Sequence, residues 1–274
     1  MRLNARLIEK PWGQIAVPHA RRAGRPTARI GEVCFEHPDG KTLPILIKYL
    51  FTSERLSIQV HPDDAQARER GHRSGKDEMW IVLEAEPDAT IGLGLTRDST
   101  LAELEQAVAD GTIVDLVEWQ PVRRGDVIYN RAGTIHAAGA GLVILEVQQS
   151  IDLTYRLYDY GRPRELHLAD GLGVARPGRH DPARDCSVSE VTGKVLVDGP
   201  HFGAAWCVGS IPTGVPFEAD HFQLVVIEGE ASVAGTMVEE GLAHLVDKLA
   251  DVKLSPGTVA LLSWPVGESQ ARVA

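Results

Sequence analysis

Short apolar or alternating segments, separated by turn residues, recur along the whole of this 274-residue chain. Segments bounded in this way by glycine, proline, aspartate or asparagine are typical of β-strands. The 27 glycines and 16 prolines stand at turn-like positions and form no low-complexity tract, as many short strands require. The sequence therefore predicts an all-β fold with few helices, a sandwich or a barrel. Strands are expected at 30–35, 45–51, 56–60, 78–84, 90–95, 114–120, 126–130 and 143–148, then at 193–197, 204–211, 222–227, 231–234 and 259–263.

Helix signals are few. In the segment Ser99–Gly111, Thr100 and Glu103 form a capping box and Gly111 is a natural stop. A shorter helix is expected after Pro62, with the pair Asp63 and Asp64 capping its start. The segment 239–251 fits either a helix or a long hairpin.

The chain divides at a stretch rich in glycine, proline, arginine and histidine. This stretch, 162–185, has no apolar periodicity and is interpreted as a connection. We expect a larger first domain at 1–165, a connecting segment at 166–185 and a smaller second domain at 186–274. The second domain repeats the strand pattern without repeating the histidines and carboxylates described below, so it is expected to be structural.

Composition excludes several classes of protein. The formal net charge of −10 argues against a nucleic-acid partner, because binding to a phosphate backbone needs a basic face. Cys34, Cys186 and Cys207 are odd in number and far apart, which predicts neither a disulfide framework nor a thiolate zinc site. No apolar run has the length of a signal-peptide core or of a membrane span, so the cytoplasm is the expected location.

Candidate metal ligands lie in three short stretches. In Ser57–Pro62, strand alternation places Ser57, Gln59 and His61 on one face. In Gly75–Trp80, Lys76 and Glu78 share a face by the same rule, and Gly125–His136 ends on a second histidine. Two imidazoles, a carboxylate and an amide oxygen are the kind of set that binds zinc, although manganese, iron and cobalt accept it too. Taken singly, each histidine is more often a hydrogen-bonded or surface residue, and a glutamate is more often solvated.

The arrangement of these stretches resembles the cupin pattern. The spacing from Gly125 to His136 fits the second cupin motif, with Arg131 where proline is usual. The first two stretches resemble the first motif, with an insert at 62–77 between histidine and glutamate and Ala85 in place of the usual glycine.

One family is matched more closely. The stretches Gln59–Asp64, Gly75–Trp80, Gly133–Ala137 and Leu145–Arg162 resemble type I mannose-6-phosphate isomerases, and Pro163–His167 resembles their short bacterial form. An early Trp-Gly at 12–13 and a later Gly-Glu at 31–32 match as well, so the resemblance runs from about Trp12 to His167. The chain is shorter between Trp12 and Lys48 than the family pattern.

This resemblance implies a cupin or jelly-roll barrel with two units, the second degenerate, and an aldose–ketose isomerase acting on mannose 6-phosphate and fructose 6-phosphate through an enediol. It implies a divalent metal, with zinc expected, a sugar-phosphate partner, and a monomer or small homo-oligomer. The implied metal ligands are Gln59, His61, Glu78 and His136. The implied catalytic residues are Glu146, Arg156 and Lys76, and the substrate-binding residues are Ser57, Lys76, Arg156 and Arg162.

Other interpretations stay open. A metal-dependent cupin oxygenase acting on an anionic substrate would use similar ligands, and a non-catalytic cupin would bind a sugar phosphate without turnover. Arg156 is equally compatible with a surface ion pair to Asp152 or Asp159. Glu146 is functional if it faces inward beside a metal, and is an ordinary surface carboxylate if it faces outward.

Overall fold

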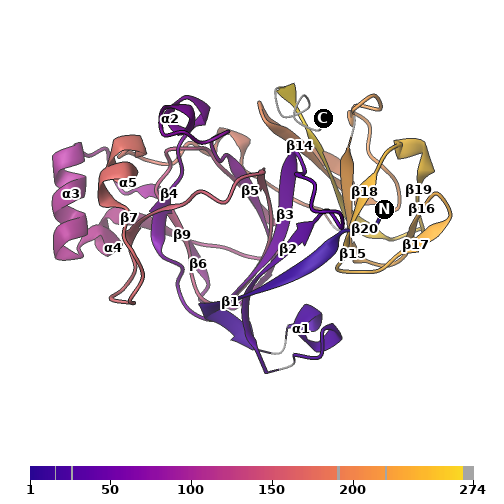
Figure 1. Ribbon diagram of the computed structural model, residues 1–274, viewed down its shortest axis with the longest axis horizontal. Coiled ribbons are helices and arrows are strands. Elements are labelled where there is room, and N and C mark those ends of the chain that lie inside the picture. Colours follow the sequence, from indigo (N-terminus) through magenta and orange to yellow (C-terminus); the bar gives the residue numbers. More distant parts are fainter. Residues whose placement is uncertain (16, 26, 190–191, 220, 268–274) are drawn as a thin grey trace.

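The chain forms a row of packed layers, seen edge-on in Figure 1. The computed structural model describes residues 1–15, 17–25, 27–189, 192–219 and 221–267. From left to right in the figure lie a group of helices, a five-stranded sheet, a seven-stranded sheet, a second five-stranded sheet and a small three-stranded sheet. The prediction of a mostly β fold with few helices is confirmed.

The two sheets of the first half face each other across an apolar core. The seven-stranded sheet has the order β1 (Asn4–Ile15), β2 (Arg29–Glu36), β3 (Ile45–Thr52), β10 (Leu142–Gln149), β5 (Glu78–Ala85), β8 (Asp126–Asn130), β12 (Cys186–Ser187). The five-stranded sheet has the order β11 (Tyr155–Tyr158), β4 (Ile58–Val60), β9 (His136–Ala138), β6 (Thr90–Leu95), β7 (Val117–Pro121). Trp80 and Ile144 of the first sheet pack with Ile91 and Ala138 of the second.

Helices cover the outer face of the five-stranded sheet. Leu104 of α3 (Leu101–Asp110), Ile113 of α4 (Ile113–Leu116) and Val174 of α5 (Leu168–Val174) join one core with strand residues such as Ile58 and Ala137. Two further helices, α1 (Pro18–Arg22) and α2 (Asp64–Glu69), follow β1 and β4. The sheet is therefore buried on both faces, and its metal-ligand candidates point away from the helices.

The second half packs on the other face of the seven-stranded sheet. Its five-stranded sheet has the order β13 (Lys194–Asp198), β14 (Phe202–Val208), β20 (Val259–Pro265), β15 (Phe222–Glu228), β18 (Ala243–Val246). Phe202 and Leu261 share one core with Phe35 and Ile47. The outermost sheet has the order β17 (Thr236–Val238), β16 (Ala231–Val233), β19 (Val252–Leu254), and two 3₁₀ turns lie at Pro182–Arg184 and Leu249–Asp251.

This double packing explains why β3 reads as an almost continuous apolar run. Ile45, Ile47, Tyr49 and Phe51 face the second half, while the opposite face looks into the core between the first two sheets. A strand buried on both faces loses the simple alternation of polar and apolar residues. Lys48 is the exception within this run, and it lies on the inner face.

Several local predictions are confirmed. Thr100 and Glu103 form the capping box of α3, and Gly111 ends it with a left-handed φ of 81°. The Asp63 side chain accepts a hydrogen bond from the Gln66 amide, so Asp63 caps α2 as expected.

Other local predictions are wrong. Residues 114–116 of the expected strand 114–120 are helical and belong to α4. The connection 162–185 contains α5, whose start has no side-chain cap and whose glycines weaken the helical signal. The segment 239–251 holds β18 and a 3₁₀ turn and is neither a helix nor a long hairpin. The division into domains at 165 and 186 stays a prediction.

Candidate functional site

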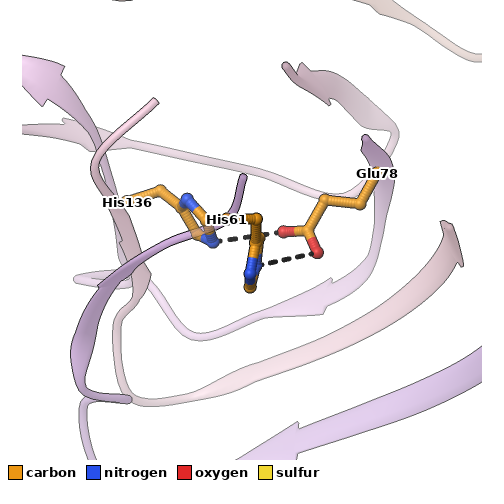
Figure 2. Close-up of side chains that lie close together, drawn as sticks. All are labelled: His61, Glu78 and His136. Atoms are coloured by element: carbon orange, nitrogen blue, oxygen red, sulfur yellow. Dashed lines mark ion pairs between the residues drawn. The ribbon is translucent and has the colours of Figure 1, made fainter. Parts of the chain in front are cut away.

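Three of the predicted ligands converge between the two sheets of the first half. His61 follows β4, Glu78 begins β5 and His136 begins β9, so two neighbouring strands face a third across the core. Figure 2 shows the two imidazoles and the carboxylate pointing toward one another. Their candidate ligand atoms all lie within 4.8 Å of one another, and all three residues are buried. The fold thus brings together His61 and His136, which lie 75 positions apart in the sequence.

The two histidines present unprotonated nitrogens to the centre of this cluster. His61 Nδ1 lies 2.8 Å from the carbonyl oxygen of Leu153, and His136 Nδ1 lies 2.9 Å from that of Thr134. A carbonyl oxygen only accepts, so each Nδ1 carries the proton and donates. Each Nε2 then keeps its lone pair. Backbone carbonyls commonly orient metal-binding histidines in this way.

Two contacts between carboxylate and imidazole atoms define the centre of the cluster. His61 Nε2 lies 3.4 Å from Glu78 Oε2, and His136 Nε2 lies 3.2 Å from Glu78 Oε1. The facing atoms in each contact are acceptors, and the Lys76 ammonium and the Gln59 amide nitrogen donate to them. Burial, reinforced by the nearby Lys76 ammonium, lowers the pKa of His61 to about 3. The imidazole is therefore neutral near pH 7, which is the form that binds a metal ion, and the donor set fits a divalent cation.

Gln59 lies beside the cluster on β4. Its backbone pairs with His136 across the two strands, and its amide nitrogen donates to His136 Nε2 at 3.2 Å. The oxygen and nitrogen of an amide group exchange places by a half-turn of the terminal bond. After that half-turn, the Gln59 amide oxygen points to the centre of the cluster, which His136 Nε2 also faces.

Lys76 supplies the positive charge at this point. Its ammonium lies 2.5 Å from Glu78 Oε2, 3.1 Å from His61 Nε2 and 3.6 Å from Glu146 Oε1. Burial opposes ionisation of Glu78, but Lys76, together with the two histidines, holds the pKa of Glu78 well below its usual range. Glu78 is therefore ionised, and the expectation that Lys76 and Glu78 share one face is confirmed.

A cavity of about 250 Å³ opens beside the cluster. Five of its lining side chains are cationic and three are carboxylates, so its charge contrasts with the net charge of −10 of the chain. A cationic cavity of this size suits an anionic small molecule. The lining residues are Lys10, Trp12, Glu32, Lys48, Leu50, Leu56, Ser57, Gln59, Lys76, Trp80, Glu146, Asp152, Thr154, Arg156 and Arg164.

Glu146 faces inward, with 2% of its side chain exposed. It accepts a hydrogen bond from Trp80 Nε1 at 2.9 Å, and its other oxygen lies 3.1 Å from Lys48 Nζ. Burial, with the nearby charge of Glu78, raises the pKa of Glu146. Of the two orientations that the sequence left open, the inward one is present.

Lys48 links Glu146 to a second carboxylate, Glu32. Lys48 Nζ lies 3.9 Å from Glu32, and Lys10 Nζ lies 2.9 Å from it. Burial opposes the charge on Lys48, but Glu146 and Glu32 raise its pKa well above the usual value. These charges form one buried chain of alternating sign along the cavity.

The predicted substrate-binding residues do not all line the cavity. Ser57 and Arg156 line the cavity, whereas Arg162 is not among the residues that line it. Arg162 instead donates to Asp159 Oδ1 at 2.7 Å and to the Arg55 carbonyl at 2.8 Å. Arg156 forms no ion pair within the described part of the chain. Its terminal nitrogen donates to the Glu165 carbonyl, and its buried Nε has no partner there.

Among the charged lining residues, the sequence analysis assigned no role to Lys10, Glu32, Lys48 and Arg164. Lys48 had a usable signal, since a lysine inside the apolar run 45–51 is too costly to bury without a partner. Lys10 precedes the Trp-Gly match at 12–13 and Glu32 belongs to the Gly-Glu match at 31–32, but neither match assigned a role to these charges. Arg164 donates from Nε and Nη2 to the Asp159 carboxylate and reaches the cavity from the same loop as Arg162.

Cys34, Cys186 and Cys207 are all free thiols, as their spacing predicted. Within the described residues, no helix is long and apolar enough to cross a bilayer.

Comparison with known proteins shows similarity over most of the chain. It is 40% identical to the mannose-6-phosphate isomerase of Streptococcus mutans over 241 residues, which are 84% of this chain and 73% of that protein. It is 33% identical to a Bacillus subtilis mannose-6-phosphate isomerase over 208 residues, 72% of this chain and 65% of that one. The crystal structure of the mannose 6-phosphate isomerase from Bacillus subtilis matches with a TM-score of 0.80 and 27% identity, covering 96% and 98% of the two chains. No protein-family model matches.

Proposed function

The chain belongs to the mannose-6-phosphate isomerase family, and we propose that it is a metal-dependent enzyme that interconverts mannose 6-phosphate and fructose 6-phosphate. The observation that carries this proposal is the cluster of His61, Glu78 and His136 opening onto a cationic cavity. The expectation of an isomerase, drawn from the sequence motifs, agrees with the similarity of sequence and fold.

The metal ligands of this proposal are His61, Glu78, His136 and, after an amide half-turn, Gln59. The two oriented Nε2 atoms and the ionised carboxylate support this set. Nitrogen and oxygen ligands in a buried set beside an open cavity suit zinc, the ion we propose. When bound, a divalent ion supplies Lewis-acid stabilisation of the oxyanion that develops as the sugar carbonyl moves.

Isomerisation requires a proton to leave one carbon and return to its neighbour through an enediol. Glu146 is our candidate for this acid–base role, because it faces the cavity and burial raises its pKa toward neutrality. Trp80 fixes one of its oxygens, and the other lies between Lys48 and Lys76. Lys76 carries a positive charge beside both Glu78 and Glu146, where it would stabilise an enediolate.

The sugar phosphate is proposed to lie toward the arginine side of the cavity. Arg156 has a buried Nε without a partner in the described residues, so this nitrogen can donate a hydrogen bond to a substrate oxygen. Arg164 and Ser57 line the same cavity, and a guanidinium matches phosphate in a bidentate fork. Arg162 stays a prediction as a phosphate ligand, since it braces the loop through Asp159.

The remaining proposals follow from the family and the composition. We propose a cytoplasmic enzyme, a monomer or small homo-oligomer, with a catalytic cupin unit at 1–165 and a degenerate unit at 186–274. A metal-dependent oxygenase remains the second candidate, because the ligand types also suit iron. The similarity to mannose-6-phosphate isomerases favours the isomerase.

The experiment is a coupled assay on the zinc-loaded chain. Mannose 6-phosphate is supplied and fructose 6-phosphate formation is followed, with oxygen consumption recorded in parallel. Turnover without oxygen consumption supports the isomerase, and uptake of one solvent deuterium in the product supports the enediol. No turnover by fully loaded protein refutes this substrate, and oxygen consumption without fructose 6-phosphate favours the oxygenase.

A further inference from the structure

A second, larger cavity lies behind the metal-ligand cluster. Its volume is about 470 Å³, within the range of small-molecule sites. Asp77, Tyr129 and Thr134 contribute from the first half, residues 176–184 from the connection, and Pro200 and His201 from the second half. None of the residues proposed for catalysis, substrate binding or metal binding lines it.

Residues of the seven-stranded sheet point alternately toward the two cavities. Along β5 and the residues before it, Lys76, Glu78 and Trp80 point toward the metal-ligand cluster. Asp77 and Met79 alternate with them and point toward the second half. Tyr129, which pairs with Met79 on β8, points the same way and donates to Asp77 Oδ2 at 2.6 Å. Asp63 and Thr134, which follow β4 and precede β9 of the five-stranded sheet, also line the second cavity.

Cationic side chains outnumber carboxylates around the second cavity. Four arginines line it, at positions 131, 176, 179 and 184, against three aspartates, at positions 63, 77 and 181. All three carboxylates accept hydrogen bonds from the protein: Asp63 from the Gln66 amide, Asp77 from Tyr129 and the Ala132 amide, and Asp181 from the Ala183 amide. In a chain with a net charge of −10, this concentration of arginine is a local exception.

Two of the arginines are free to bind a ligand. Arg176 lies 3.5 Å from Asp63, and Arg179 lies 3.6 Å from Glu118. Arg131 and Arg184 form no ion pair with any carboxylate among the described residues. Arg184 instead lies over the Tyr129 ring, 5.0 Å from its centroid. Arg131 and Arg184 both raise the positive potential at the Tyr129 hydroxyl, so the two guanidinium groups act on the same side of the cavity.

We propose that this cavity is a second binding site for a phosphate group, separate from the site of isomerisation, with Arg131 and Arg184 as its main contacts. The guanidinium fork matches phosphate oxygens in pairs, and several arginines around one space favour a multiply charged anion. The cavity is larger than free phosphate needs, so both an organic phosphate and inorganic phosphate are to be tested. The proposal rests on this cavity and not on the proposed isomerase activity.

The site has a direct structural link to the metal ligands. Asp77 precedes Glu78, and the Thr134 carbonyl accepts the proton of His136 Nδ1. A bound phosphate would therefore lie against the backbone that orients two of the three clustered ligands.

The test is isothermal titration calorimetry on the metal-free 274-residue chain, with inorganic phosphate and ADP as separate probes. Three variants are compared with the unchanged chain: Arg131→Gln/Arg184→Gln in the second cavity, Arg164→Gln in the first, and Arg97→Gln/Arg123→Gln as a matched change of charge. The last pair lies outside both cavities, in ion pairs with Glu103 and Asp126. Circular dichroism verifies that each variant is folded.

We expect Arg131→Gln/Arg184→Gln to weaken binding of at least one probe by about tenfold or more, since hydrogen bonds to charged groups are each strong. The matched pair should change it less than about twofold, as screened surface charges do. Tighter binding of ADP would identify an organic phosphate as the ligand, and equal binding would identify inorganic phosphate. Binding that is abolished by Arg164→Gln alone, binding that is unaffected by Arg131→Gln/Arg184→Gln, or no binding of either probe would overturn the proposal.

Discussion

Glu32 is predicted to contribute stability that depends on pH. Its side chain is 14% exposed and lies 2.9 Å from Lys10 and 3.9 Å from Lys48. Burial opposes its ionisation, but the ammonium groups of Lys48 and Lys10 outweigh burial and lower the pKa of Glu32 from 4.5 to about 2. A carboxylate with a lowered pKa in the folded state stabilises the fold at pH values above its unfolded pKa.

The magnitude follows from that shift. At about 1.36 kcal/mol per pKa unit, the ionised Glu32 contributes about 3 kcal/mol to the free energy of unfolding at pH 7. The contribution is lost as the pH falls from 4.5 through about 2, and roughly half of it or less remains at pH 3. Glu32→Gln removes the charge and keeps the shape, so it should destabilise the chain most at neutral pH.

Urea unfolding from pH 7 to pH 3 measures this difference. Glu36→Gln serves as the control, because Glu36 pairs with Arg6 at 2.6 Å but is 44% exposed. Exposed pairs of this kind contribute at most about 1 kcal/mol. The reasoning is refuted if Glu32→Gln destabilises no more than Glu36→Gln at pH 7, or if its effect is the same at pH 3.

Three further variants test other parts of the structure. Thr100→Ala removes the cap of α3 and should lower the free energy of unfolding by about 1 kcal/mol; an unchanged urea midpoint would contradict the cap. Gly203→Ala places a methyl group against the Trp264 ring and should cost roughly 1–3 kcal/mol, which a melting temperature equal to that of the unchanged chain would disprove. Arg164→Gln should raise KM for the sugar phosphate about tenfold with a smaller change in kcat, and a loss confined to kcat would count against a phosphate contact.

Sequence reasoning predicted the fold class because strand length and turn residues are local signals. It located α3 for the same reason, because the signals for the two ends of this helix lie within one segment: the capping box of Thr100 and Glu103, and Gly111. It missed β1, because Lys10, Pro11 and Gly13 interrupt any alternation in a strand that pairs irregularly with β2. It also missed α5, which has glycines at 171 and 173 and is held by packing on the five-stranded sheet.

The ligand cluster was predictable, and its surroundings were only partly so. His61, Glu78 and His136 stand in recognisable motifs, and strand alternation places Lys76 beside Glu78. The chain of charges from Glu146 through Lys48 to Glu32 depends on which strands are neighbours in the sheet. That order joins β10 to β3 and β3 to β2, and no local pattern specifies it. The different positions of Arg162 and Arg164 likewise depend on how one loop folds around Asp159.

The central claim is that a metal ion held by His61, Glu78 and His136 is required for isomerisation. The most direct measurement titrates zinc into the metal-free chain and records bound metal and fructose 6-phosphate formation on the same samples, for the unchanged chain and for His136→Ala. Our account predicts that activity rises with bound zinc and reaches its plateau at about one ion per chain, the number that one such ligand set holds. It also predicts that His136→Ala binds zinc at least about tenfold more weakly and loses turnover. Full activity without metal, or unchanged metal binding and turnover in His136→Ala, would contradict the account.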